Sequence, residues 1–224
     1  MRIGIIVAMD VEYRNLCASL GGHECGLWNN GRHEVRLLQC GIGKVNAAVG
    51  TTDMIKDFQP QFVLSTGLAG GVASTVDRWD AVVAERTAYH DVFCGMGNEY
   101  GQVQGQPLFF RSDAGFVETA MSVANKVMDG QKVHKGLICT GDQFITNREA
   151  LDKIASVFPD VLACDMESAA IAHVCHIKNV PFLSLRIISD TPGRTADHKM
   201  QWEEALRLMG DHSFRIVESL LNSL

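Results

Sequence analysis

Short apolar runs and longer segments of helical periodicity alternate along this chain. The run Arg2–Val7 is apolar without a break, which is typical of a strand covered on both faces. Similar runs predict further strands at residues 34–40, 62–66, 80–85, 136–140 and 182–188.

The segments between the strands predict helices. One helix follows the turn at 41–43 and ends before Pro60, with one face formed by Val45, Ala48, Val49 and Thr52. Ser112 is expected to cap the next helix, and Thr146 has capping-box spacing to Glu149 ahead of another. Other helices are predicted over 10–20, 166–175 and 202–220.

Alternating strands and helices predict a three-layer α/β/α sandwich with a central mixed, largely parallel sheet. The chain has 224 residues and no repeat or linker, so we expect a single domain over 1–224. In such sheets ligands bind at the carboxyl ends of strands. Residues 9–12, residues 67–71 and Asp190 each follow a predicted strand, which predicts one pocket fed by several strand ends.

Charge and hydropathy narrow the classes of partner. The formal net charge is −6 and no Lys/Arg-rich block occurs, which argues against nucleic acid or an anionic membrane as partner. No apolar run approaches the ~18–20 residues that cross a bilayer. The first apolar stretch is too short for a secretory signal, so we expect a cytoplasmic protein.

The seven cysteines predict free thiols rather than a disulfide framework. Their number is odd and no two of them form a C-x-x-C pair, which fits a reducing compartment. His173 and Cys175 point in different directions on a helix, so we expect no metal site there, and we expect no cofactor.

Acidic residues stand at the starts of two predicted helices. Asp10 and Glu12 follow the first strand, and Asp165 and Glu167 precede an apolar helix. Taken alone, helix capping explains each pair, since acids in a first turn complement the helix dipole. The glycine-rich stretch at 65–71 lacks both the dinucleotide and the Walker spacing, and a plain tight turn explains it equally well.

The segment SLRIISDTPG, residues 184–193, is harder to explain by capping. Arg186 lies inside an apolar run, where an arginine needs an acidic partner or a ligand. Ser189 and Asp190 end that run. A half-buried carboxyl group has a raised pKa and can hold a proton at neutral pH. Three carboxylates and an arginine at strand ends together favour an active site over capping.

These segments, in this order, resemble the nucleoside phosphorylase/nucleosidase superfamily, and most closely its bacterial 5′-methylthioadenosine/S-adenosylhomocysteine nucleosidases. The resemblance extends from the first residues through about Asp190, and more loosely along the last helix. It rests on GIIVAMDVE, GIGKVNAA, STGLAGG, YHD, EYGQ, TGDQFI, DMESAAIAHVC and RIISD. It implies hydrolysis of the N-glycosidic bond of 5′-substituted adenine nucleosides, with release of adenine.

The resemblance also implies residue roles for the chemical step. Asp190 occupies the position of the acid that protonates the departing purine, and Ser189 would support it. Glu12 occupies the position of the base that holds the attacking water, with Arg186 beside it. Met9 belongs to the same predicted substrate site. Two carboxyl groups flanking a glycosidic bond are also what the chemistry of glycoside cleavage requires.

Further residues match positions that bind the nucleoside. Glu167 would grip the ribose hydroxyls and Met166 would pack against the sugar. Phe144 would stack on adenine, with Ile145 contacting the base through its backbone. We place at Trp202 the aromatic residue that closes the 5′ side. A homodimer is implied as well, because residues 92–96 correspond to a segment that reaches a neighbouring pocket in relatives.

Departures from the family pattern leave alternatives open. Leu68 stands where serine is common and offers no donor to phosphate, and the phosphorylases' GDP-x-R motif is missing. Both observations favour water over phosphate as the nucleophile. The alternatives are a futalosine-type nucleosidase, a phosphate-dependent phosphorylase and a nucleoside-binding protein without catalysis. The preferred 5′ substituent stays open, because residues 92–96 and 191–202 are altered.

Overall fold

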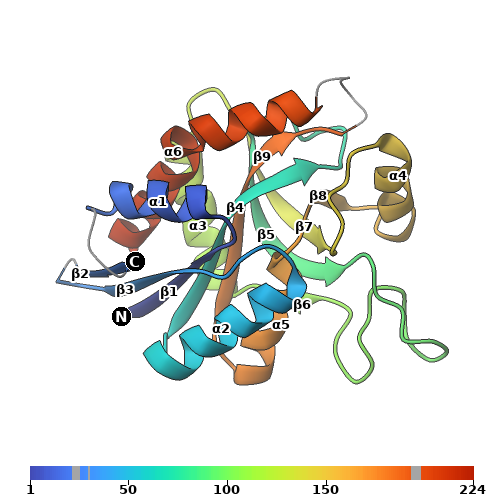
Figure 1. Cartoon of the computed structure of the whole chain (residues 1–224), viewed down its shortest axis with the longest axis horizontal. Helices are drawn as coiled ribbons and strands as arrows, with labels where there is room; N and C mark the ends of the chain where they lie inside the picture. Colours follow the sequence, from blue (N-terminus) through green and yellow to red (C-terminus); the bar gives the residue numbers. More distant parts are fainter. Residues whose placement is uncertain (22–25, 30, 193–197) are drawn as a thin grey trace.

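The computed structural model describes residues 1–21, 26–29, 31–192 and 198–224, with only the backbone described at 198–199 and 206–213. Figure 1 shows helices on both sides of a central sheet. The strands are β1 (Arg2–Val7), β2 (Leu27–Asn29), β3 (Glu34–Gln39), β4 (Phe62–Gly71), β5 (Ala81–Tyr89), β6 (Phe110–Arg111), β7 (Val133–Thr140), β8 (Val161–Asp165) and β9 (Phe182–Asp190). The helices are α1 (Asp10–Ser19), α2 (Lys44–Phe58), α3 (Ala114–Val127), α4 (Arg148–Val157), α5 (Ser168–Lys178) and α6 (His198–Ser223).

The predicted α/β fold with a central mixed sheet is confirmed. β1 pairs in parallel with β3 and β4, and β7 pairs in parallel with β5 and β8. β9 pairs in parallel with β4 and antiparallel with β5, while β4 pairs antiparallel with β8. The strands β4, β8, β7, β5 and β9 therefore close into a ring, which the sequence did not predict.

Alternate side chains of β1 enter two different cores. Ile3 and Ile5 pack in a core with residues of α1, α3 and α6, whereas Ile6 packs with residues of α2 and α5. This division follows from the period of two along a strand. It explains why the strand reads as a continuous apolar run, since both of its faces are covered (Figure 1).

The predicted face of α2 points away from the sheet. Val45 is 74% exposed and Val49 is 56% exposed, whereas the buried side is formed by Ala47, Gly50, Thr51, Met54 and Phe58. The first part of this buried side carries small residues, Ala47, Gly50 and Thr51, because the helix lies very close to the end of β3 there. A Cβ atom added at Gly50 would lie 2.7 Å from the Cβ of Cys40. Val45 and Val49 lie on the outer face of this part of the helix.

Two predicted helix caps are each displaced by one residue. Asp113, not Ser112, caps α3, because its carboxylate accepts hydrogen bonds from the N–H groups of Gly115 and Phe116. Asn147, not Thr146, caps α4 by accepting from the N–H of Ala150. Neighbouring residues of good capping type compete for one position, and sequence spacing alone does not separate them.

Candidate active site

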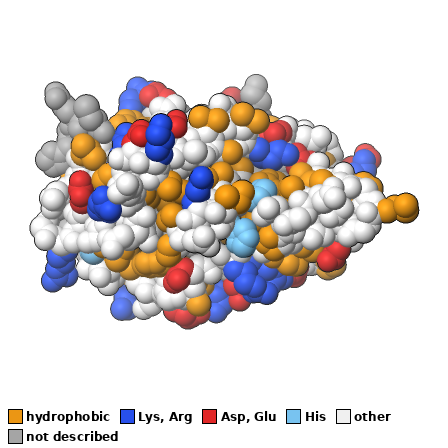
Figure 2. Space-filling view, turned by 90° about the horizontal axis from the view of Figure 1, so that it is seen from below, with side chains coloured by type: hydrophobic (Ala, Val, Ile, Leu, Met, Phe, Trp, Pro, Cys, Tyr) orange, Lys and Arg blue, Asp and Glu red, His pale blue; other side chains and the backbone are white. Residues whose placement is uncertain are grey.

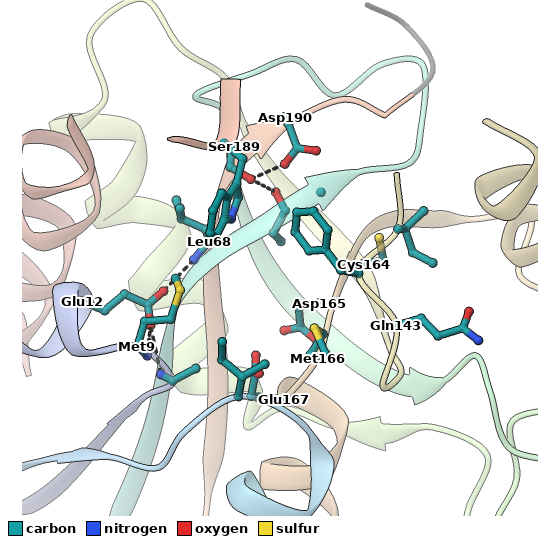
Figure 3. A pocket seen from close by; sticks show the side chains of 17 residues that line it. Met9, Glu12, Leu68, Gln143, Cys164, Asp165, Met166, Glu167, Ser189 and Asp190 are labelled. Carbon is teal, nitrogen blue, oxygen red and sulfur yellow. Dashed lines mark hydrogen bonds between the residues drawn. The ribbon is translucent and has the colours of Figure 1, made fainter. Parts of the chain in front are cut away.

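One pocket collects the segments that the sequence placed at strand ends. It lies among the last residues of β8 and β9, the second half of β4, and the segments that follow β1 and β7 (Figure 3). All of the predicted site residues line it except Arg186: Met9, Glu12, Phe144, Ile145, Met166, Glu167, Ser189, Asp190 and Trp202. Ile42, Leu68 and Cys164 also line it.

Glu12 is buried in the first turn of α1 and is held by backbone N–H groups. Its Oε2 atom accepts hydrogen bonds from the N–H groups of Ala8 and Met9, both at 2.9 Å. Its Oε1 atom accepts from the N–H of Leu68 at 3.3 Å. Burial raises the pKa of Glu12, although these hydrogen bonds and Arg186 oppose the rise. Glu12 thus serves as a helix cap and also lines the pocket.

Gly67 provides the space in which the Glu12 carboxyl group lies. A Cβ atom added at Gly67 would come within 2.5 Å of Glu12 Oε1, and the residue has φ of +154°. The first glycine of STGLAGG is therefore required by a close approach and by its backbone conformation. This gives the glycine-rich stretch a structural role beyond a tight turn.

Asp190 ends β9 and is only 3% exposed. The Ser189 hydroxyl donates a hydrogen bond to Asp190 Oδ1 and lies 3.2 Å from the carbonyl oxygen of Ala69. Figure 3 shows Asp190 and Glu12 on different sides of the pocket. A bound molecule would therefore meet one carboxyl group on each side.

Glu167 lies at the N-cap position of α5 and faces the same pocket. Its Oε1 atom accepts a hydrogen bond from the N–H of Gly43 at 2.8 Å, which joins the start of α2 to the start of α5. Burial raises the pKa of Glu167, and the neighbouring Asp165 raises it further. A carboxyl group in this setting has an oxygen left to accept a hydroxyl hydrogen bond.

Arg186 lies behind the pocket wall instead of lining it. Its Nε donates to Asp165 Oδ2 at 2.8 Å and its Nη2 donates to the Ser65 hydroxyl at 2.8 Å. Asp165 also accepts hydrogen bonds from the hydroxyls of Thr140 and Ser168. The acidic partner that an arginine in an apolar strand requires is therefore Asp165, and this ion pair is almost fully buried.

Aromatic side chains form another part of the pocket. The rings of Phe144 and Trp202 meet edge to face, with centroids 5.6 Å apart and planes at 69°. Phe144 is 52% exposed, so its ring is open to a stacking partner. Ile145, next to it, is buried in the core of β7 and α4. Of the segment 191–202 that precedes this wall, residues 193–197 lie outside the described residues.

The loop that carries Phe144 is tied to the start of α2 by a cluster that the sequence did not single out. Lys44 Nζ contacts both carboxylate oxygens of Asp91, at 2.7 and 2.8 Å. Asp142 accepts from the Lys44 N–H at 2.8 Å and donates its own N–H to Asp91. The sequence resemblance rests in part on the strings KVN, YHD and TGD, which contain these residues. Only the fold brings Lys44, Asp91 and Asp142 together.

The described part of the chain presents neither a metal-binding cluster nor a membrane-spanning helix. Among the described side chains, those of 1–21, 26–29, 31–192, 200–205 and 214–224, no group of three or more His, Cys, Asp or Glu residues is arranged to hold a metal ion. Among the same residues, no helix has both the length and the hydropathy that crossing a bilayer requires.

Comparison with known proteins gives consistent matches along the chain. Residues 2–222 match the family described as the phosphorylase superfamily. A 5′-methylthioadenosine/S-adenosylhomocysteine nucleosidase of Actinobacillus succinogenes is 41% identical, and the alignment covers 100% of both chains.

Solved structures agree. The S-adenosylhomocysteine nucleosidase of Streptococcus pyogenes, in complex with 5-methylthiotubericidin, is 36% identical with a TM-score of 0.91, covering 100% of this chain and 97% of that one. The 5′-methylthioadenosine/S-adenosylhomocysteine nucleosidase of Neisseria meningitidis, in complex with methylthio-immucillin-A, is 33% identical with a TM-score of 0.90. The alignment covers 100% of this chain and 99% of that one.

Proposed function

Because this chain belongs to the phosphorylase superfamily and, within it, to the 5′-methylthioadenosine/S-adenosylhomocysteine nucleosidases, we propose that it hydrolyses the N-glycosidic bond of 5′-substituted adenine nucleosides. The products are adenine and the 5′-substituted ribose. One observation carries the chemical part of the proposal. Two buried carboxyl groups, Glu12 and Asp190, face one pocket from different sides.

In the proposed reaction Asp190 is the general acid and Glu12 is the general base. Asp190 donates its proton to the imidazole-side nitrogen of the purine, so the bond between that purine and the sugar carbon breaks with neutral adenine leaving. Glu12 holds a water molecule and accepts one of its protons while the water oxygen bonds to the same sugar carbon. The Ser189 hydroxyl orients Asp190, and backbone N–H groups fix Glu12.

The remaining pocket residues suit the rest of such a nucleoside. The exposed Phe144 ring is proposed to stack on adenine, and Glu167 to accept hydrogen bonds from the ribose hydroxyls. Met9, Met166 and Trp202 supply apolar surface for the sugar and its 5′ substituent. Arg186 acts from behind the wall, since its positive charge favours the ionised forms of Glu12 and Glu167.

Adenine release from 5′-methylthioadenosine tests this function, first in phosphate-free buffer and then with added phosphate. We expect release without phosphate, together with free methylthioribose, because Leu68 offers no side-chain donor to an anion at the pocket. Release only with phosphate would identify a phosphorylase. Release only from other 5′-substituted nucleosides, such as futalosine, would change the substrate class. Tight adenine binding without turnover would indicate a binding protein.

We also propose that the chain forms a homodimer through the outer face of α2. Ile42, Val45 and Val49 are each more than half exposed, and Ile42 reaches the pocket. Figure 2, which shows the molecule from the side of α2 and α5, has hydrophobic side chains distributed along this face. Phe93, Met96 and Tyr100 are further exposed large hydrophobic residues. Such surfaces mark interaction sites.

Val49→Glu is therefore expected to convert the dimer to a monomer, because it places a charge in the apolar interface. Light scattering after size-exclusion chromatography measures the mass of each species. Val157→Glu, at an exposed apolar position of α4, is the matched control and should leave the mass unchanged. A wild-type chain that elutes as a monomer at micromolar concentration contradicts the proposal.

The proposed site of action is the cytoplasm. Cys25 lies outside the described residues. The six described cysteines are all free thiols: Cys17, Cys40, Cys94, Cys139, Cys164 and Cys175. Free thiols persist in a reducing compartment. Fractionation of cells followed by detection of the chain tests this, and recovery outside the cytoplasmic fraction argues against it.

A further inference from the structure

Arg78, in the segment between β4 and β5, contacts two separate parts of the pocket wall. Its Nε donates to the carbonyl oxygen of Ser189 at 3.0 Å, directly before Asp190. Its Nη2 donates to the carbonyl oxygen of Gln201 at 2.9 Å and to Glu204 Oε2 at 2.8 Å. Gln201 and Glu204 flank Trp202 on α6. One guanidinium group thus joins the strand end that carries the acid to the helix that carries the aromatic wall.

The backbone around Arg78 strengthens the same link. The N–H of Trp79 donates to the carbonyl oxygen of Ile188 at 2.8 Å. The N–H of Ile188 in turn donates to the carbonyl oxygen of Asp80 at 2.9 Å. Trp79 has φ of +73°, a conformation that is uncommon for a bulky residue. The Arg78 guanidinium lies over its ring at 4.6 Å. The segment 78–80 is therefore built against the end of β9.

We propose that Arg78 is a positioning residue, which holds Asp190 and Trp202 in fixed positions relative to each other at the pocket. This inference rests on the proposed function of the pocket. Arg78 does not line the pocket, so it acts through the residues that do. Its side chain is 22% exposed, and a planar group with several donors is needed to serve three acceptors at once.

The hydrogen bond of Arg78 to β9 and its hydrogen bonds to α6 predict different kinetic effects. Glu204→Gln weakens only the link of Arg78 to α6, so Trp202 should be held less firmly. This should raise KM about threefold or more and leave kcat nearly unchanged. Arg78→Met removes the hydrogen bonds to both β9 and α6, so it should lower kcat as well, with a loss of about ten- to a hundredfold in kcat/KM. Arg78→Lys should restore part of this loss, because one ammonium group reaches fewer acceptors.

Arg86→Met is the matched control. The Arg86 side chain is also 22% exposed, is ion-paired with Asp160 and lies over an aromatic ring, that of Phe109. None of these partners lines the pocket. The same substitution there should lower thermal stability to a similar degree and leave kcat and KM within about twofold of wild type.

A readout that does not depend on turnover completes the test. In a Trp28→Phe/Trp79→Phe background Trp202 is the single tryptophan, and acrylamide quenching reports how freely solvent reaches it. Quenching should increase in Arg78→Met and in Glu204→Gln, and stay unchanged in Arg86→Met. This result stands even if no tested nucleoside is cleaved, so failure of the proposed function is recognised separately.

The inference is overturned if Arg78→Met and Arg86→Met show equal kinetic losses, since Arg78 would then contribute only to general stability. Unchanged Trp202 quenching in Arg78→Met also contradicts it. Where Arg78→Met does not fold, Arg78→Lys and Glu204→Gln decide: wild-type KM and wild-type quenching in both variants contradict a positioning role.

Discussion

Asp190→Asn should lower the rate of adenine release by about three orders of magnitude while leaving nucleoside binding detectable. Asparagine keeps the shape of the side chain and an oxygen that can accept the Ser189 hydrogen bond. It carries no proton that can be transferred to the purine, so the departing base leaves as an anion. Single-turnover adenine release measures the chemical step, and quenching of protein fluorescence by a bound adenine nucleoside measures binding.

Two further variants define what this result means. Asp152→Asn makes the same change at a mostly exposed position of α4 and should have no effect on turnover. Ser189→Ala keeps the carboxyl group but removes the hydroxyl that donates to it, so a smaller loss of about tenfold is expected. Near-wild-type turnover by Asp190→Asn would show that another group protonates the purine.

Much of this site was predictable because its chemistry is encoded locally. Asp190 and Glu12 each lie at or just beyond the end of an apolar strand, and parallel strands bring such ends to one edge of a sheet. The identity of each residue and its distance from a strand therefore sufficed to place both in one pocket. Glu167 was placed in a different way, from its position at the start of a predicted apolar helix, and it lies at the N-cap of α5.

The parts that sequence reasoning missed depend on contacts between distant segments. β8 is a short apolar run, whose periodicity does not distinguish a strand from part of a helix. The pairing of β9 with both β4 and β5 closes the ring of strands, and no local pattern encodes it. Arg186 was expected to bind substrate, but it does not line the pocket, because its side chain is paired with the distant Asp165.

The outer face of α2 illustrates the same limit. Apolar periodicity shows that Val45 and Val49 share a face, but it does not say what covers that face. Gly50 is required on the inner face because the helix and the end of β3 lie close together, a property of the assembled fold. Arg78 is the extreme case, since its hydrogen-bond partners lie more than a hundred residues away in the chain.

Glu12→Gln should reduce turnover by about three orders of magnitude, because an amide cannot accept a proton from the attacking water. Burial raises the pKa of Glu12, so the base is ionised only above the ordinary range for a glutamate. In the wild-type protein kcat/KM should therefore fall as the pH drops through this raised pKa. The residual activity of Glu12→Gln should lack that acidic limb.

Gly67→Ala tests the placement of Glu12 without removing it. The new methyl group would meet Glu12 Oε1 at 2.5 Å and force the carboxyl group or the β4 backbone to move. The hydrogen bond from Leu68 would be lost first, since at 3.3 Å it is the longest of the three. We expect an intermediate loss of about a hundredfold in kcat with the acidic limb retained, since the base is present but displaced. Full activity in Gly67→Ala would mean that the base tolerates a shift of its position. Full activity in Glu12→Gln would mean that another group activates the attacking water.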